Sequence, residues 1–264
     1  KEIKRLGYNC KEVSDFTGFP EILNGRVKTL HPKIHAGILN KRNDKSHQHQ
    51  MKSSKFEDID LVVVNFYPFE KTLEKTKSPD QIIENIDVGG PTMVRAAAKN
   101  YENVVILTRL EQYEKLIQEL DQNKGYTSLG FRQKLSEEAF LETASYDAMI
   151  STYLSKKNRT IHPNKKVITA NLIEVLRYGE NSHQNASIYS LSNSLNLKQL
   201  SGKKLSYNNY NDMYAAINIS KSLPYNVGSV IVKHANPCGV SINKNKAQSY
   251  KEALNCDPIS AFGG

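Results

Sequence analysis

Residues 25–32 (GRVKTLHP) gather side chains that suit an anion. Arg26, Lys28 and Thr29 place two cations and a hydroxyl within four residues, next to a glycine. Such donors bind phosphates and other oxyanions. If the segment is extended, Arg26 and Lys28 project to the same side. An ordinary basic loop has the same composition, so spacing alone leaves both interpretations open.

Residues 87–100 (DVGGPTMVRAAAKN) offer an acid and a base around a glycine turn. Gly-Gly followed by proline predicts a tight loop that leads into a helix. Free N–H groups at a helix start favour an anion. Asp87 and Lys99 bracket this turn and would suit proton transfer. Arg95 and Lys99 would share one helix face, and a helix with an exposed basic edge is the alternative interpretation.

Polar side chains follow the apolar run at residues 61–64 (LVVV). Asn65 and Tyr67 come directly after it. In open α/β sheets, ligands gather beyond the carboxyl ends of the strands. These two side chains are therefore placed to contact a base or an amide. An asparagine turn that ends the strand is the alternative.

Two segments of the second half are rich in groups that could do chemistry. Residues 176–184 (LRYGENSHQ) place many hydrogen-bond donors in a predicted loop. The apolar run at 230–232 predicts a strand that leads into Lys233 and His234, which could supply a cation and a proton shuttle. A structural histidine with satisfied hydrogen bonds is equally compatible with this segment.

Zinc chemistry is excluded by spacing. His234 and Cys238 partly match a zinc deaminase, which needs His-x-Glu followed by Pro-Cys-x-x-Cys. Asn236 stands where the glutamate is required, and no second cysteine follows Cys238. His47 and His49 belong to a polar stretch that we expect to be a solvated loop. The sequence therefore predicts no metal site.

Apolar patterning predicts the elements that position these groups. Continuous β-branched runs at 61–64 and 104–107 are typical of strands covered on both faces. One apolar stripe from Leu110 to Leu120 and a longer one from Phe131 to Ala148 predict two helices. Strands that alternate with helices indicate a parallel α/β sheet.

A basic stretch with few apolar residues, 156–166, predicts a boundary between two unlike α/β domains. Beyond it the patterns predict further strands and helices. The strands are expected at 186–191 and 230–232, and the helices around 212–223 and 247–254.

Composition excludes several classes of protein. The 264 residues carry a net charge of +9 but no apolar run of about 18, so no membrane-spanning helix is expected. The first residues, KEIKRL, lack the apolar core of a secretory leader. Three scattered cysteines indicate a reducing cytoplasm. The cations are dispersed and do not alternate with aromatic side chains, which disfavours a nucleic-acid-binding surface.

Seven stretches, in order along the chain, resemble the bifunctional purine-biosynthesis family. Its members combine a transformylase acting on phosphoribosylaminoimidazolecarboxamide (AICAR) with an IMP cyclohydrolase. The matching stretches are residues 16–21, 25–32, 65–69, 87–100, 176–184, 233–239 and 257–264. The resemblance implies a methylglyoxal-synthase-like α/β cyclohydrolase domain over residues 1–166. Residues 167–264 would begin a transformylase domain with a cytidine-deaminase-like fold.

The resemblance also implies the chemistry. The family transfers a formyl group from 10-formyltetrahydrofolate to AICAR, and then closes formyl-AICAR to IMP with loss of water. It implies small-molecule nucleotide substrates, no metal, no nucleic acid and no membrane partner. A cytoplasmic location and a homodimer of the full-length protein are implied as well.

Individual residues take roles by matching the family motifs. Asp87 and Lys99 would be catalytic in the cyclohydrolase, with Lys99 as proton donor and acceptor. The nucleotide would be contacted by Arg26, Val27, Lys28, Thr29, Asn65, Tyr67 and Gly89. In the transformylase, Lys233 and His234 would assist attack by the amine. AICAR would be bound by Arg177, Tyr178, Asn211 and Gly263.

The chain departs from the family pattern at both ends. The family's first strand and its phosphate loops would precede residue 1, and most folate contacts would follow residue 264. We therefore expect a fragment that is inactive or active only as a cyclohydrolase. Two other hypotheses stay open at this point: a regulatory nucleotide-binding module on the same scaffold, and a basic nucleic-acid-binding protein. Turnover and salt-dependent binding distinguish them.

Overall fold

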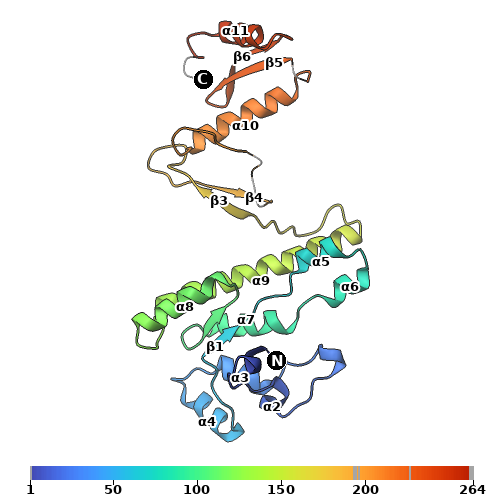
Figure 1. The fold of residues 1–264 in the computed structure, drawn as a ribbon, viewed down its shortest axis with the longest axis vertical. Helices are drawn as coiled ribbons and strands as arrows, with labels where there is room; N and C mark the ends of the chain where they lie inside the picture. The colour runs from blue at the N-terminus through green and yellow to red at the C-terminus, as the bar shows by residue number, and fades with distance from the viewer. Residues whose placement is uncertain (1, 193–194, 196, 226, 262–264) are drawn as a thin grey trace. The chain divides into compact units, whose positions relative to one another are not determined.

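The computed structural model describes residues 2–192, 195, 197–225 and 227–261. The chain forms two compact units, Lys1–Ile168 and Thr169–Gly264. We call them the first and the second unit (Figure 1). The division follows the basic stretch at 156–166, and each unit has an apolar cluster of its own.

The first unit is built on two parallel strands, β1 (Leu61–Val63) and β2 (Val105–Leu107). Both strands and their parallel pairing were predicted and are confirmed. The residues of β2 are buried throughout, whereas in β1 Leu61 is 41% and Val63 is 45% exposed. The expected cover on both faces is therefore wrong for β1. Alternate side chains of a strand point to opposite faces, and only the face of Val62 is packed.

Helices surround this strand pair. They are α1 (Glu2–Arg5), α2 (Val13–Thr17), the 3₁₀ turn η1 (Leu23–Gly25), α3 (Pro32–Leu39), α4 (Lys45–Ser54), α5 (Phe69–Lys75), α6 (Pro79–Glu84), α7 (Gly89–Lys99), α8 (Glu111–Gln122) and α9 (Leu129–Lys157). The helix predicted at the Gly-Gly-Pro turn is α7, and the two helices predicted from apolar stripes are α8 and α9. The loop expected around His47 and His49 is wrong, because both lie on α4. The Asp44 carboxylate caps that helix by accepting the N–H groups of Ser46 at 2.8 Å and His47 at 3.2 Å.

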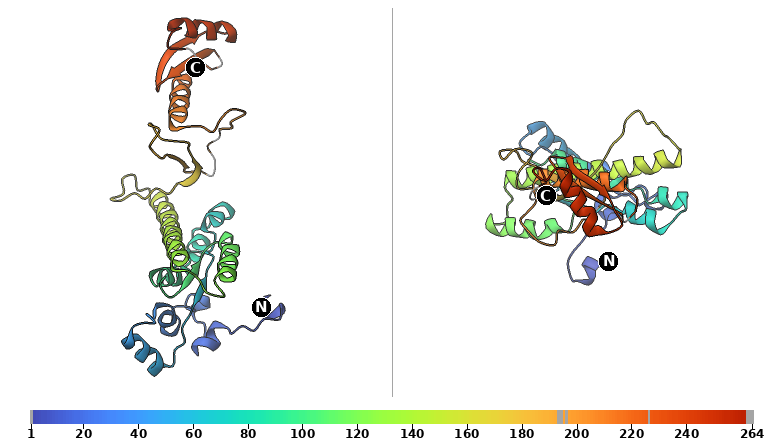
Figure 2. Two further views of the ribbon diagram at one scale, coloured as in Figure 1. Left: turned by 90° about the vertical axis from the view of Figure 1, so that its left-hand side faces the viewer. Right: turned by 90° about the horizontal axis from the view of Figure 1, so that it is seen from above.

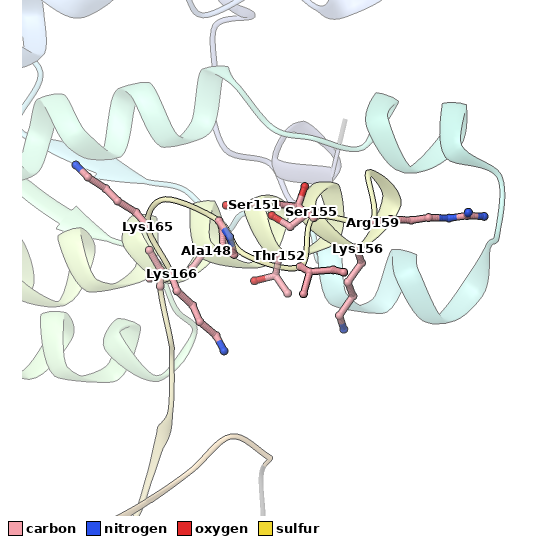
Figure 3. A pocket seen from close by; sticks show the side chains of 12 residues that line it. Ala148, Ser151, Thr152, Ser155, Lys156, Arg159, Lys165 and Lys166 are labelled. Carbon is pink, nitrogen blue, oxygen red and sulfur yellow. The ribbon is translucent and has the colours of Figure 1, made fainter.

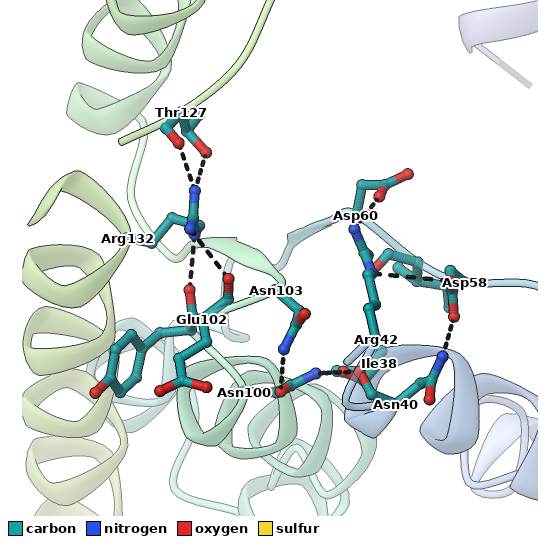
Figure 4. Close-up of polar contacts among 12 residues, drawn as sticks. Ile38, Asn40, Arg42, Asp58, Asp60, Asn100, Glu102, Asn103, Thr127 and Arg132 are labelled. Carbon is teal, nitrogen blue, oxygen red and sulfur yellow. Dashed lines mark hydrogen bonds and ion pairs between the residues drawn. The ribbon is translucent and has the colours of Figure 1, made fainter. Parts of the chain in front are cut away.

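Helices α3 and α7 pack against each other and are tied at their C-terminal ends. The Asn100 side chain donates to the carbonyls of Ile38, at 2.7 Å, and Asn40, at 2.9 Å (Figure 4). Buried residues of both helices, among them Ile38 and Val94, join one apolar cluster. Because the C-terminal ends coincide and the helices pack together, their N-terminal ends share the other side of the unit.

The long helix α9 packs against α7, α5 and β2 (Figures 1 and 2). Its N-terminal half contributes Leu135 and Ala139 to the main cluster. Its C-terminal half contributes Tyr146, which with Phe69 and Ile82 forms a second, smaller cluster. One helix therefore connects both apolar clusters of the first unit.

The second unit consists of two antiparallel hairpins and two helices. The hairpins pair β3 (Asn171–Val175) with β4 (Ser187–Ser190) and β5 (Gly228–Lys233) with β6 (Asn236–Ile242); the helices are α10 (Tyr207–Lys221) and α11 (Lys246–Cys256). Strands β4 and β5 and both helices were predicted. Strands β3 and β6 were missed. Strand β6 opens on Asn-Pro-Cys-Gly, of which Asn, Pro and Gly are rare in strands. Gly239 is required there, since any Cβ would overlap the Ala253 carbonyl of α11.

Two further features concern the described helices and the cysteines. None of the described helices is both long and apolar enough to cross a membrane. Cys10, Cys238 and Cys256 carry free thiols.

Candidate functional site

The two glycine-containing segments of the first unit meet at the N-terminal ends of α3 and α7. A Cβ placed on Gly89 would lie 2.6 Å from Thr29 Oγ1, closer than side chains tolerate. A Cβ on Gly90 would overlap the Asp87 carboxylate. The glycine pair therefore allows the Thr29 hydroxyl and the Asp87 carboxylate to approach the same helix start, from residues far apart in the sequence.

Asp87 is half-buried and is held at two of its atoms. Its Oδ1 accepts the N–H of Gly90 at 2.9 Å, and its own backbone N–H donates to the Tyr146 hydroxyl at 2.8 Å. Oδ2 has no hydrogen-bond partner among the described residues and is available to a donor on a substrate. The helix start that the sequence offered to an external anion is thus partly satisfied by the chain's own carboxylate.

The two cations of the first segment face separate carboxylates. Lys28 Nζ lies 2.8 Å from Glu21 Oε2, and this hydrogen bond raises the pKa of Lys28; Tyr67 contributes in the same direction. Arg26 pairs with Glu84, which raises the pKa of Arg26 and lowers the pKa of Glu84. Both pairs are exposed, where ion pairs contribute little stability. An incoming anion can therefore displace either carboxylate at low cost.

In the segment that follows β1, the Phe66 side chain packs into the core, whereas Asn65 and Tyr67 are exposed. The Phe66 ring packs inward against Tyr146, with ring centroids 5.1 Å apart. Tyr67 is 61% exposed. Asn65 is also exposed, and its amide donates to the Tyr113 hydroxyl at 3.2 Å.

Lys99 lies elsewhere. It is exposed at the last position of α7, ten residues beyond Gly89. At 1.5 Å per residue, the helix separates the two by about 15 Å. The Arg95 guanidinium lies 5.7 Å from the centre of the Phe140 ring. The structure therefore brings Thr29, Asp87 and Gly89 together but does not bring Lys99 to them.

In the second unit, the two predicted segments meet along α10. At the start of this helix, the N–H of Tyr207 donates to the Tyr178 carbonyl at 3.3 Å, and the Asn208 amide donates to the Glu180 carbonyl at 3.1 Å. Farther along, Asp212 Oδ1 accepts the N–H of Ala235 at 2.7 Å. Four residues of helix span about 6 Å, so the loop of Tyr178 and the turn of His234 lie one helical turn apart.

The turn between β5 and β6 is strained. It consists of His234 (φ 53°) and Ala235 (φ 60°), and both have left-handed backbone conformations. Tight hairpin turns demand this geometry and usually supply it with glycine or asparagine. Other residues lose about 1–2 kcal/mol each. Such strain clusters at functional sites, and here it presents the exposed His234, next to the half-buried Lys233.

The other predicted residues of this unit that the structure describes do not take part in these hydrogen bonds to α10. The Arg177 guanidinium lies 5.2 Å from the centre of the Tyr178 ring. Asn211 is exposed on α10. Gly263 lies outside the described residues.

A hollow of about 450 Å³ lies at the C-terminal end of α9, and none of the predicted residues that the structure describes lines it. Hydroxyls and cations line it, namely Ser151, Thr152, Ser155, Lys156, Arg159, Lys165 and Lys166. Figure 3 shows Lys165 and Lys166 pointing in opposite directions and Arg159 pointing away from both. The cations do not converge on one point as a phosphate site requires.

Metal-ligating side chains do not gather in the described part of the chain. No group of three or more His, Cys, Asp and Glu side chains is placed there to hold a metal ion. His47 instead uses its Nδ1 to accept the N–H of Lys41 at 3.1 Å.

Two protein families match the chain. The model of one, described as "AICARFT/IMPCHase bienzyme", matches residues 97–264, more than half of the sequence. The chain belongs to this family. The model of the other, described as "MGS-like domain", matches residues 1–92. These matches confirm the resemblance found in the sequence and the mixed α/β fold with a methylglyoxal-synthase-like region.

Curated relatives are similar over the whole chain. "Bifunctional purine biosynthesis protein PurH" of Bradyrhizobium diazoefficiens is 45% identical and covers 100% of this chain and 51% of its own length. The proteins of that name from Prochlorococcus marinus and Clostridioides difficile are 48% and 45% identical, covering 96% and 100% of this chain. The chain spans about half the length of the curated relatives it matches. A solved structure, "Crystal structure of ForH", is 34% identical with a TM-score of 0.48, covering 57% of this chain and 78% of its own.

Proposed function

We propose that the first unit carries out the IMP cyclohydrolase reaction and that the second unit contributes to an AICAR transformylase site. Family membership supports both activities. The observation that carries the cyclohydrolase proposal is the close approach of Thr29 and Asp87 at the Gly89–Gly90 pair, with one carboxylate oxygen left unpaired.

Ring closure moves two protons from nitrogen to oxygen. The carboxamide nitrogen of formyl-AICAR bonds to the formyl carbon and loses one proton, and the formamide nitrogen loses the other as its double bond to that carbon forms. The formyl oxygen takes up both protons and leaves as water when its bond to the carbon breaks. We assign Asp87 Oδ2 as the acceptor for the carboxamide N–H. Lys28, whose pKa the hydrogen bond to Glu21 raises, would donate a hydrogen bond to an oxygen of the substrate.

The remaining first-unit residues are assigned to binding. Thr29, Gly89, Asn65 and Tyr67 would contact the base and carboxamide, with Arg26 and Val27 toward the phosphate. Lys99 stays a prediction from the motif, because about 15 Å of helix separates it from Gly89. Its role as proton donor and acceptor is therefore tested separately below.

For the second unit we propose a cytidine-deaminase-like fold in which Lys233 and His234 assist formyl transfer from 10-formyltetrahydrofolate. Arg177, Tyr178, Asn211 and Gly263 would bind AICAR. The meeting of two of these segments along α10 supports the assignment. We further propose a cytoplasmic homodimer acting on nucleotides, with neither a metal ion nor a nucleic acid or membrane partner.

Formation of IMP from formyl-AICAR, followed by ultraviolet absorbance, tests the cyclohydrolase proposal. Asp87→Asn keeps the shape of the side chain and removes its charge, so we expect turnover to fall at least about 100-fold. Lys251→Ala, on an exposed position of α11, should leave turnover unchanged. Full activity in Asp87→Asn would contradict the assignment. Binding without turnover in the unmodified chain would indicate a regulatory nucleotide-binding module.

Lys99→Ala decides between two arrangements. Unchanged turnover would mean that the residues gathered at Asp87 suffice. A loss comparable to that of Asp87→Asn would show that Lys99 reaches a reacting substrate, and would overturn the assignment of proton transfer to Asp87 and Lys28 alone.

A further inference from the structure

We propose that Tyr146 is a positioning residue that fixes Asp87, and with it the segment after β1, for the ring-closing step. The inference rests on the cyclohydrolase function proposed above. Nothing in the sequence patterns marks Tyr146, which lies in the interior of α9 and is only 3% exposed. Its place is defined by contacts with two segments that precede it by 59 and 80 residues.

The first contact is polar. The backbone N–H of Asp87 donates to the Tyr146 hydroxyl at 2.8 Å. A buried tyrosine hydroxyl needs a hydrogen-bond partner, and a buried N–H needs an acceptor. The side chain of Asp87 is bonded at the same time to the N–H of Gly90. With backbone and Oδ1 both held, the direction of the unpaired Oδ2 is set by Tyr146 and Gly90 together.

The second contact is aromatic. The Tyr146 ring lies 5.1 Å from the Phe66 ring, centroid to centroid, at an interplanar angle of 49°. It lies 6.2 Å from the Phe69 ring at 71°. Phe66 stands between Asn65 and Tyr67, the two exposed residues assigned to binding. One side chain of α9 therefore fixes both the carboxylate and the adjoining binding segment.

The hydroxyl stays neutral under ordinary assay conditions. Burial raises the pKa of Tyr146; the hydrogen bond from the Asp87 N–H opposes this, and the Asp87 carboxylate adds to it, with a net rise. A neutral phenol keeps the geometry of the N–H to hydroxyl bond constant near neutral pH. The contact is therefore a fixed support and not a switch.

The chain offers a matched pair of substitutions. Tyr146→Phe removes only the hydroxyl and keeps the ring packing. Tyr153→Phe is the control, because Tyr153 lies two turns farther along α9 and also packs edge-on against Phe69, at 6.0 Å. The Tyr153 hydroxyl has no hydrogen-bond partner among the described residues, so its removal should be silent.

Kinetics test whether Tyr146 acts through Asp87. We expect Tyr146→Phe to lower kcat for ring closure about tenfold with KM changed less than about twofold, since a displaced carboxylate weakens the transition state more than binding. Tyr153→Phe should retain the unmodified rate. In an Asp87→Ala background, Tyr146→Phe should cause no further loss. Additive losses would overturn the inference, because they would show an effect independent of Asp87.

Amide hydrogen exchange tests the same contact without turnover. Tyr146→Phe should speed exchange at Asp87 at least about tenfold, beyond any change in Tyr153→Phe. Equal exchange in both variants would overturn the inference. If the unmodified chain does not form IMP, the proposed function fails, and exchange decides the role of Tyr146 separately. Should Tyr146→Phe not fold, 3-fluorotyrosine at this position keeps the ring and weakens the oxygen as an acceptor, and it should speed Asp87 exchange less strongly.

Discussion

Asp87 in the first unit and His234 in the second are held by different means. Asp87 is fixed by the Tyr146 hydroxyl, by Gly90 and by the close approach of Thr29 to Gly89. His234 occupies a two-residue turn with left-handed backbone conformations, and the described bond from α10 to that turn is the one that Asp212 makes with Ala235.

The two residues are therefore held in place by different interactions. The first site is arranged by packing among α3, α7 and α9, so small steric changes should propagate to it. The turn in the second unit stores backbone strain that one carboxylate opposes. Substitutions there should act through strain and through that bond, with local consequences.

The largest effect is expected from crowding the first site. Gly89→Ala places a methyl group against Thr29 Oγ1, 2.6 Å away. A shift of about 1 Å can reduce activity about 100-fold, and we expect a loss of that order in IMP formation. Gly130→Ala is the control, since nothing lies within 4 Å of a Cβ there. Wild-type activity in Gly89→Ala would mean that packing at this point does not position the site.

The next effect concerns the hydrogen bond from α10 to the turn. Asp212→Ala leaves the N–H of Ala235 without its acceptor, at a cost of about 1–3 kcal/mol. We expect the Ala235 amide to exchange roughly 10- to 100-fold faster, which is the same energy expressed as a ratio. Asn218→Ala, exposed on the same helix, should not change it. If Asp212→Ala exchanges like the unmodified chain, other contacts hold the turn.

Relief of strain gives a smaller effect of opposite sign. Ala235→Gly accepts the left-handed conformation without a Cβ and should stabilise the chain by about 1 kcal/mol. Thermal unfolding would show this as a higher Tm. Val88→Gly, beside Asp87 with φ −108°, has no such strain to relieve and should lower Tm. A higher Tm for Val88→Gly as well would mean that the gain in Ala235→Gly does not come from relief of backbone strain.

The smallest effect depends on pH. His35 Nε2 is buried without a hydrogen-bond partner, and burial lowers the pKa of His35. The unfolded chain therefore binds a proton at higher pH than the folded chain. The free energy of unfolding should fall as pH drops below about 6.5. Urea unfolding at neutral and mildly acidic pH measures this fall in the free energy of unfolding. The fall should be smaller in His35→Gln than in the unmodified chain. It should be unchanged in His49→Gln, which alters an exposed residue.

The sequence predicted the elements better than their contacts. Continuous apolar runs identified β1 and β2, and the helical stripes identified α8 and α9. The apolar run alone could not show that the side chains of Leu61 and Val63 stay exposed, because their burial depends on whether other segments pack against that face of the strand. Motif matching selected Thr29 and Asp87, but their meeting at Gly89 is a tertiary contact between distant segments.

Other placements had no local signal. Tyr146 interrupts no pattern, and a buried tyrosine in a long helix is ordinary by sequence. Lys99 belongs to the same motif as Asp87, yet a continuous helix carries it away, because eleven regular residues extend about 16 Å. The strain at His234 and Ala235 depends on the hairpin register, which the missed strand β6 determines.

Titration of IMP into the ¹⁵N-labelled chain tests the central claim most directly, since it locates the nucleotide without requiring turnover. We expect saturable amide shifts at Thr29, Asp87 and Gly89, and slightly smaller shifts at Lys28. We expect none at the hollow near Lys165. Shifts confined to that hollow or to the second unit, with Thr29 and Asp87 unmoved, would contradict the assignment of the cyclohydrolase site.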